Sequence, residues 1–154
     1  KDFEQAGIIK KGSQMINAVT NSTVPHLTLI FGNSYGAGTY AMSGRAFNNR
    51  FTFIWPSAKI AVMGGKQIAG VMSIVRRGQA ARKGVPFDEA TDAMIVAAVE
   101  AIQEKGSIAL EASGAISDDG IIDPRDTRTA LGICLSVVRT RPIEGAKGYG
   151  VFRL

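Results

Sequence analysis

The stretch from His26 to Gly44, HLTLIFGNSYGAGTYAMSG, constrains the fold of this chain more than any other. It begins with an apolar run at Leu27–Phe31, which is typical of a buried β-strand. A glycine-rich segment, Gly32–Gly38, follows and predicts a sharp turn into a short helix through Thr39–Met42. The first amides of a helix have no partner within it, so such a turn can bind a negatively charged oxygen. The alternative is a tight strand-to-helix connection whose glycines only allow close packing.

The rest of the chain adds further strands and helices. Apolar residues from Ile8 to Val19 recur every three or four positions, which predicts an amphipathic helix that ends before Pro25. The other expected elements are strands at Phe51–Trp55 and Lys59–Met63 and helices at Lys66–Arg82, Phe87–Lys105 and Pro124–Val138. This order indicates a layered α/β fold. We expect Leu27–Phe31 to be its central strand, covered by helices on both faces, with the other two strands beside it.

The composition argues against several classes of protein. The 154 residues are 45% hydrophobic and 20% charged, which is typical of one globular domain. The single cysteine, Cys134, excludes an internal disulfide, and the single histidine, His26, argues against a histidine-rich metal site or a complete Ser-His-Asp triad. The net charge is +5, but the basic residues occur singly or in pairs, without a nucleic-acid-binding motif. No apolar run is long enough to cross a bilayer. We therefore expect an intracellular chain that binds neither nucleic acid nor membrane.

Four other features carry weaker signals. Gly64-Gly65 lies at a second strand-to-helix turn and is either an amide site or a simple turn. Asp118 and Asp119 precede a glycine and are interpreted as turn residues rather than acid–base carboxylates. Cys134 shares the spacing of an apolar helix face and is interpreted as a buried side chain rather than a nucleophile. Trp55 is interpreted as a core or interface aromatic rather than a stacking platform.

Several motifs occur together in the order found in one family. They are GIIKKG at residues 7–12, GNSYGAGTYAM and SGRAF at 32–47, WP at 55–56, VMGG at 62–65, DDGIIDP and DTR at 118–128, and GVFRL at 150–154. On these motifs the chain resembles the C-terminal part of the carboxyltransferase (β) subunit of biotin-dependent acyl-CoA carboxylases, most closely the methylcrotonoyl-CoA and geranyl-CoA branch. The motifs extend over nearly the whole chain and are together far more specific than one glycine turn.

The resemblance implies a crotonase-like (ClpP/crotonase) α/β fold, a spiral of ββα units, in which residues 1–154 form part of the C-terminal carboxyltransferase domain. It implies that the backbone amides of Ala37 and Gly38 stabilise the negatively charged ring oxygen of biotin, which is carried on a separate carrier domain. Biotin itself then takes the α-proton of the thioester, so neither a side-chain base nor a metal is expected in this chain. The residues implied to bind biotin around these amides are Tyr35, Gly36, Gly64 and Gly65.

The family's partners are implied as well. They are an acyl-CoA substrate, a biotin carboxylase and biotin carrier subunit, and further copies of the chain in a homo-oligomer. The implied location is the cytoplasm, or the mitochondrial matrix in a eukaryote. The residues at Lys66, Thr39 and Ser43 differ from those usual in the family, which leaves the acyl preference open.

The chain starts abruptly within a helical pattern and without Met, which predicts a fragment of a longer subunit. In the family, the active site lies between the N-terminal domain of one protomer and the C-terminal domain of another. We therefore expect the isolated chain to be inactive, and to self-associate through the surfaces that the missing domain would cover. The alternative is a non-catalytic module that keeps the fold and the oligomer surface.

Overall fold

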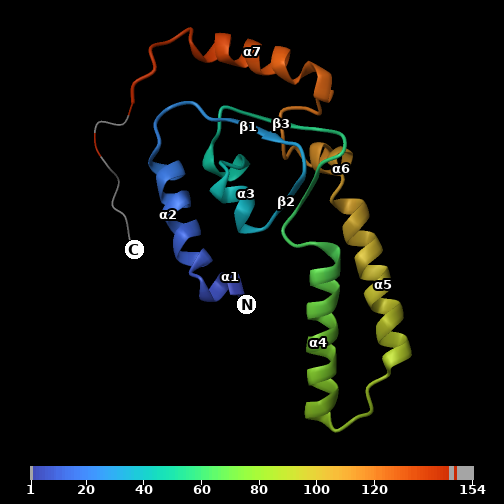
Figure 1. The fold of residues 1–154 in the computed structure, drawn as a ribbon. Coiled ribbons are helices and arrows are strands. Elements are labelled where there is room, and N and C mark those ends of the chain that lie inside the picture. The colour runs from blue at the N-terminus through green and yellow to red at the C-terminus, as the bar shows by residue number, and fades with distance from the viewer. Residues whose placement is uncertain (1, 146–147, 149–154) are drawn as a thin grey trace.

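The computed structural model describes residues 2–145 and 148 and is a mixed α/β structure (Figure 1). Strands and helices follow the order ββα twice before a mainly helical second half. In chain order the elements are α1 (Asp2–Gln5), α2 (Ile8–Asn21), β1 (Leu27–Ile30), β2 (Asn33–Tyr35), α3 (Ala37–Ala41), η1 (Arg45–Phe47), β3 (Phe51–Ile54), β4 (Lys59–Ala61), α4 (Gly65–Lys83), α5 (Glu89–Gly106), α6 (Ala109–Gly114), η2 (Pro124–Asp126) and α7 (Thr127–Val138).

The two ββα units pair strand by strand. β1 and β3, the first strands of the units, are parallel, with Leu27 opposite Phe51 and Ile30 opposite Ile54. The second strands, β2 and β4, form a separate parallel pair. Parallel neighbours require a crossover between them, and here α3 with η1 supplies it (Figure 1). The arrangement is the repeated ββα pattern expected for a crotonase-like fold.

The predicted place of Leu27–Phe31 at the centre of one sheet is wrong. Among the described residues β1 pairs only with β3, its first three residues are half-buried, and Phe31 is 64% exposed. The strand expected at Lys59–Met63 is the shorter β4, which pairs with β2 rather than with β1. The reason is that the glycine-rich segment contains a strand, β2, whose sequence Asn-Ser-Tyr is too short and polar to show a hydrophobic period.

The central strand is β3. It lies between β1 and the segment around Ile121, and the side chains of Thr52 and Ile54 on it are fully buried. The Thr52 carbonyl accepts a hydrogen bond from the Asp119 amide, and the Ile54 carbonyl accepts one from the Ile122 amide. The core around β3 is small and consists of Ile30, Ile54, Ala58, Ala109 and Ala112, with Ile60 packed against it.

The later helices follow the sequence expectations closely, except for α6, which the sequence did not predict. α4 and α5 match the expected Lys66–Arg82 and Phe87–Lys105, and they form an antiparallel hairpin that extends away from the strands (Figure 1). The expected start at Pro124 is a short 3₁₀ turn, η2, that leads into α7. The Asp123 carboxylate caps this turn by accepting the Arg125 amide.

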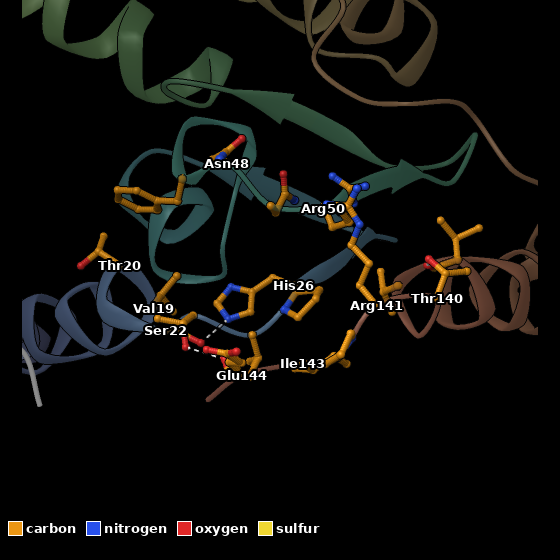
Figure 2. Close-up of a pocket in the computed structure, with 18 of the residues that line it drawn as sticks. Val19, Thr20, Ser22, His26, Asn48, Arg50, Thr140, Arg141, Ile143 and Glu144 are labelled. Atoms are coloured by element: carbon orange, nitrogen blue, oxygen red, sulfur yellow. Dashed lines mark hydrogen bonds between the residues drawn. The ribbon is translucent and has the colours of Figure 1, made fainter. Parts of the chain in front are cut away.

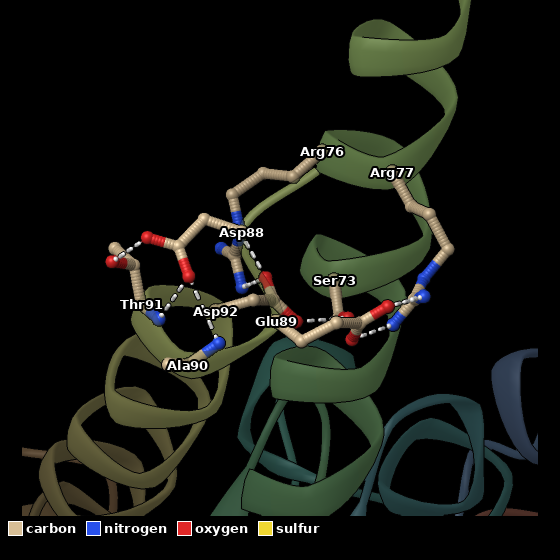
Figure 3. Close-up of polar contacts among 8 residues, drawn as sticks. All are labelled: Ser73, Arg76, Arg77, Asp88, Glu89, Ala90, Thr91 and Asp92. Carbon is tan, nitrogen blue, oxygen red and sulfur yellow. Dashed lines mark hydrogen bonds and ion pairs between the residues drawn. The ribbon is translucent and has the colours of Figure 1, made fainter. Parts of the chain in front are cut away.

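A polar clamp joins the two helices near the tip of the hairpin (Figure 3). Asp92 of α5 is buried and accepts hydrogen bonds from Ser73 and from Arg76 Nε, the latter over 2.7 Å. Arg77 and Glu89 form a second, exposed ion pair beside it. The hydrogen bond from Ser73, supported by that from Arg76 and outweighing desolvation, holds the pKa of the Asp92 carboxyl below its usual range. The clamp therefore requires Asp92 to be ionised.

This clamp predicts a specific acid sensitivity. Because the pKa of Asp92 is lower in the folded chain, its contribution is complete above the unfolded pKa of about 4 and is lost as the pH falls below it. We expect Asp92→Asn to lower the urea midpoint at pH 7, and the gap to wild type to narrow at pH 3. Glu89→Gln, in the exposed pair, is the control and should change the midpoint little. An equal difference in urea midpoint between wild type and Asp92→Asn at both pH values would contradict the role of the ionised Asp92 carboxylate.

Several helices expose apolar faces that a globular domain normally buries. The periodic helix predicted at Ile8–Val19 is present as α2, yet Ile9 is 74% exposed and no residue of α2 is buried. Ile74 on α4 and Ile102 on α5 are also more than 70% exposed. Isolated apolar residues on a surface are ordinary, but several on neighbouring turns of long helices indicate contact surfaces. No helix within residues 2–145 is apolar over the length that crossing a bilayer requires.

Candidate functional site

The two glycine turns lie next to each other at the carboxyl ends of a parallel strand pair. β2 ends at Tyr35 and leads through Gly36 into α3, while β4 ends at Ala61 and leads through Gly64 into α4. The Gly36 amide donates to the Ala61 carbonyl over 3.1 Å, which joins the end of β2 to the end of β4. Ligands of α/β proteins commonly bind outside the carboxyl ends of parallel strands, where helices begin. The two glycine turns that the sequence offered as amide sites therefore lie at the same edge of the β2–β4 strand pair.

Gly36 is the glycine that the first turn requires. Its φ is 60° and its ψ is −141°, a backbone conformation that side chains with a Cβ rarely adopt. A Cβ built on Gly36 would also lie 3.3 Å from the carbonyl oxygen of Val62. Gly38, by contrast, lies within α3 without a positive φ, and a Cβ there would meet nothing within 4 Å. Gly36 therefore gives the first turn its shape, whereas Gly38 does not.

The first two amides of α3 are available as donors. The Thr39 amide donates back to the Gly36 carbonyl over 3.2 Å, which closes the first turn. In the part of the chain that the structure describes, no hydrogen bond uses the N–H groups of Ala37 or Gly38. Ser34 on β2 lies within hydrogen-bond distance of Thr39, 2.8 Å between hydroxyl oxygens, and fastens the helix start to the strand. Two neighbouring donors fixed in this way can stabilise one oxygen on which negative charge develops.

The second turn offers its donors differently. The Gly64 amide already donates to the side-chain oxygen of Gln67 over 3.2 Å, and the Gly64 carbonyl accepts from the amides of Gln67 and Ile68. No hydrogen bond among the described residues uses the Gly65 amide. A Cβ on Gly65 would lie 3.1 Å from the carbonyl oxygen of Glu100, so α5 packs closely against this glycine. Gly65, rather than Gly64, is the free donor of the pair, and the sequence did not identify Gln67 as the residue that caps Gly64.

A cavity of about 640 Å³ lies beside the second turn, between β2, β4, the start of α4 and the last turns of α5. Tyr35 borders it together with Gly64 and Gly65, so the structure brings three of the predicted residues together. Its charged lining residues are Lys59, Lys66, Glu100 and Glu104. Lys59 is paired with Glu104, whereas Lys66 and Glu100 have no ion pair within the described residues. Neither glutamate was predicted from the sequence as part of this site, because both lie on α5, more than 30 positions after Lys66.

Gly36 borders a different cavity, of about 500 Å³ and mostly apolar, next to Val62 and to residues of α6. Ala37 and Gly38 border neither of these cavities. The six predicted residues therefore share one edge of the strand pair but not one enclosed space.

A larger cavity, about 1170 Å³, lies elsewhere, at the amino ends of β1 and β3 (Figure 2). His26 borders it, with its ring hydrogen-bonded to Ser22 at 2.9 Å. Its lining includes the carbonyl ends of α2 and α7, and Arg45 there is paired with Asp119. None of the six predicted site residues borders this cavity.

The weaker candidates have structural roles. Asp119 accepts hydrogen bonds from Arg45 and from the Thr52 amide. The buried Asp118 accepts one from Ser113 at Oδ1, and its Oδ2 has no hydrogen-bond partner among the described residues. Cys134 is 5% exposed, and burial raises the pKa of its thiol, which confirms a packing residue. Trp55 packs against Phe31 and donates its indole N–H to Thr127.

Within residues 2–145 no three His, Cys, Asp or Glu side chains are grouped closely enough to hold a metal ion. The motif at residues 150–154, part of the resemblance, lies outside the described residues.

The chain is similar to known proteins in both sequence and fold. Residues 1–150 match the family model described as the carboxyl transferase domain. The chain is 58% identical over its whole length to a probable biotin-dependent acyl-coenzyme A carboxylase beta2 subunit of Mycobacterium tuberculosis, and 43% identical to the biotin-dependent 3-methylcrotonyl-coenzyme A carboxylase beta1 subunit of the same organism. All of the chain aligns with the crystal structure of the P. aeruginosa geranyl-CoA carboxylase beta subunit, with 40% identity and a TM-score of 0.82. The chain spans 29% of the length of each of these three proteins.

Proposed function

The chain belongs to the carboxyl transferase domain family, and on that premise we propose that it is the C-terminal part of the carboxyltransferase subunit of a biotin-dependent acyl-CoA carboxylase. The reaction moves a carboxyl group from carboxybiotin to the α-carbon of an acyl-CoA thioester. The single observation that supports this role most directly is the pair of free amides at Ala37 and Gly38, held next to Gly36 at the carboxyl end of β2.

Biotin, carried on a separate domain, supplies the carboxyl group when it is bound at this edge. The Ala37 and Gly38 amides would hold the ring oxygen of biotin by hydrogen bonds and would stabilise negative charge on it. The positive-φ turn at Gly36, which glycine adopts without strain, and the contact between Ser34 and Thr39 hold both N–H groups in place before the ligand arrives. Such preorganised donors need no rearrangement during the reaction.

The neighbouring cavity fits the remainder of the ligand. Its volume of about 640 Å³ is sufficient for a bicyclic ring and part of its carrier arm. Tyr35 supplies an aromatic surface at its border, and the Gly65 amide supplies a third free donor. We therefore assign Tyr35, Gly64 and Gly65 to biotin binding at this cavity, with Gly64 acting through backbone shape because Gln67 occupies its amide. Gly36, which does not border this cavity, is assigned to the same site through the shape that it gives to the first turn.

We further propose an acyl-CoA of the methylcrotonoyl type as the substrate, because two of the compared proteins are named for methylcrotonyl-CoA and geranyl-CoA. The other partners proposed are a biotin carboxylase with its carrier, and further copies of the subunit. The cytoplasm, or the mitochondrial matrix in a eukaryotic cell, is the location that we propose from the family.

The direct test uses the full-length subunit that contains this chain. Carboxylated biotin is supplied with acetyl-CoA, propionyl-CoA, methylcrotonoyl-CoA or geranyl-CoA, and transfer of the labelled carboxyl group is measured. We expect transfer to methylcrotonoyl-CoA or geranyl-CoA to be the fastest. Transfer to none of the four by a folded subunit would reject the enzymatic role and favour the assembly module.

The exposed apolar faces predict how the 154-residue chain behaves alone. Ile9 on α2, Ile74 on α4 and Ile102 on α5 need partners to leave water, so we expect concentration-dependent association in sedimentation velocity. We also expect no carboxyl transfer by the 154-residue chain alone, because in the proposed subunit another domain supplies the part of the site that binds acyl-CoA. A monomer across micromolar concentrations would contradict the association, and turnover by the isolated chain would contradict the shared site.

A further inference from the structure

Ser43 has an unfavourable backbone conformation at the end of the proposed catalytic helix. It lies two residues beyond the end of α3, its φ is 58°, and it is 7% exposed. A residue with a Cβ seldom adopts positive φ, and in a buried position the surrounding structure must hold it there. Ser43 is thus a position at which the neighbouring contacts determine the path of the chain.

Four hydrogen bonds hold Ser43. Its carbonyl accepts from Thr28 Oγ1 over 2.8 Å and from Asn49 Nδ2 over 3.0 Å, and its amide donates to the Tyr40 carbonyl over 3.0 Å. Its hydroxyl oxygen lies 2.8 Å from Nδ1 of His26. The other ring nitrogen of His26, Nε2, lies 2.9 Å from the hydroxyl of Ser22, just after α2 (Figure 2). His26 therefore links the end of α2 to the end of α3.

α3 depends on such external contacts for its position. It has five residues, which is too short for its own hydrogen bonds to keep it folded. Its last turn is closed by the bond from the Met42 amide to the Gly38 carbonyl, over 3.1 Å, immediately before Ser43. The following residue packs against the same helix, since a Cβ on Gly44 would lie 2.6 Å from the Thr39 carbonyl oxygen. Any shift at Ser43 is therefore passed to the peptide groups of Gly38 and Thr39.

We propose that His26 and Ser43 are positioning residues, which hold α3 through the hydrogen bond between His26 Nδ1 and the Ser43 hydroxyl and so fix the Ala37 and Gly38 amides. The catalytic part of this inference rests on the proposed function, but the positioning part does not. Neither residue borders the cavity beside the proposed biotin site. Since a misplacement of about 1 Å far from the chemistry can cost up to a hundredfold in rate, a short helix with free donors is sensitive to such support.

The test compares matched variants of the full-length subunit. Ser43→Ala and Ser22→Ala each remove one of the two hydroxyl groups that hydrogen-bond to the His26 ring. Only Ser43 is connected to α3. His26→Asn keeps an amide near the position of Nδ1 and should still reach Ser43, whereas His26→Gln places its amide near Nε2 and should reach Ser22 instead. The readouts are kcat, KM for the acyl-CoA, and hydrogen–deuterium exchange of peptides spanning residues 35–43.

We expect Ser43→Ala and His26→Gln to lower kcat by about tenfold to a hundredfold, to leave KM within about twofold, and to speed exchange in residues 35–43. Ser22→Ala and His26→Asn should stay close to wild type in all three. Equal behaviour of the four folded variants, with changes in melting temperature alone, would overturn the proposal. If Ser43→Ala does not fold, the comparison of His26→Gln with His26→Asn tests the proposal. If the wild-type subunit transfers no carboxyl group, the proposed function fails, while the exchange data still decide the positioning role.

Discussion

Replacing Gly38 with Val in the full-length subunit is expected to lower carboxyl transfer by about a hundredfold or more, or roughly 3 kcal/mol of transition-state stabilisation, if its amide is an oxyanion donor. The structure gives a steric reason. Gly38 has ordinary helical geometry, and a Cβ there would meet nothing within 4 Å, so the valine side chain would extend into the open space beside the amides. It would keep the ring oxygen of biotin out of hydrogen-bond reach without straining the fold.

Two controls make the Gly38 measurement decisive. Gly38→Ala adds only one carbon and should lose less activity than Gly38→Val, because the smaller group blocks less of the approach. Cys134→Ala, in the core of α7, should lower the melting temperature and leave turnover unchanged. Turnover is measured after circular dichroism has shown that each variant is folded. Near-normal turnover by folded Gly38→Val would mean that the segment is only a strand-to-helix connection.

The fold was predictable where hydrophobic periods are long. α2, α4, α5 and α7 lie where their apolar spacing and capping residues place them, because each extends over at least three turns. The strands were less predictable. β2 is three residues of Asn-Ser-Tyr, and its strand conformation comes from pairing with β4 rather than from its own composition. Without β2, one sheet centred on Leu27–Phe31 was the simplest interpretation, although the ββα repeat forms two parallel pairs.

The parts of the proposed site that are neighbours in sequence were predictable, whereas the contacts between distant segments were not. Gly36, Ala37 and Gly38 are neighbours in sequence, so the motif alone was enough to place the free amides at the start of a helix. The closeness of the two turns depends on the Gly36 amide reaching the Ala61 carbonyl, a contact between strands that no local pattern shows. The same limit applies to Ser43 and His26, which are 17 positions apart and meet only in the folded chain.

The sequence also left open which glycine of the turn has a positive φ. Positive φ is a property of backbone geometry, and a run with glycines at 32, 36 and 38 does not reveal which of them adopts it. In the structure Gly36 has positive φ, whereas Gly32 and Gly38 do not. A residue with a Cβ would therefore add backbone strain at Gly36 but not at Gly38, so the two glycines can be tested for separate roles.

Gly36→Ala is accordingly expected to damage both stability and activity. Its φ of 60° and ψ of −141° lie in a region that residues with a Cβ rarely occupy, at a typical cost of about 1–3 kcal/mol. The added methyl group would also lie 3.3 Å from the Val62 carbonyl, which must shift to accommodate it. A shift there separates the end of β2 from the end of β4 and turns the Ala37 and Gly38 amides away from their common target. We expect a lower urea midpoint and a loss of carboxyl transfer of at least about tenfold.

Gly38→Ala is the matched control for this change, two residues further along the same segment. Because Gly38 is helical and its surroundings are open, alanine there should leave the urea midpoint unchanged or raise it slightly. Gly36→Ala should therefore be the less stable of the two variants, although both make the same chemical change. If the two had equal midpoints, the backbone at Gly36 would not be strained. The shape of the turn would then have to come from its side-chain contacts, chiefly the one between Ser34 and Thr39.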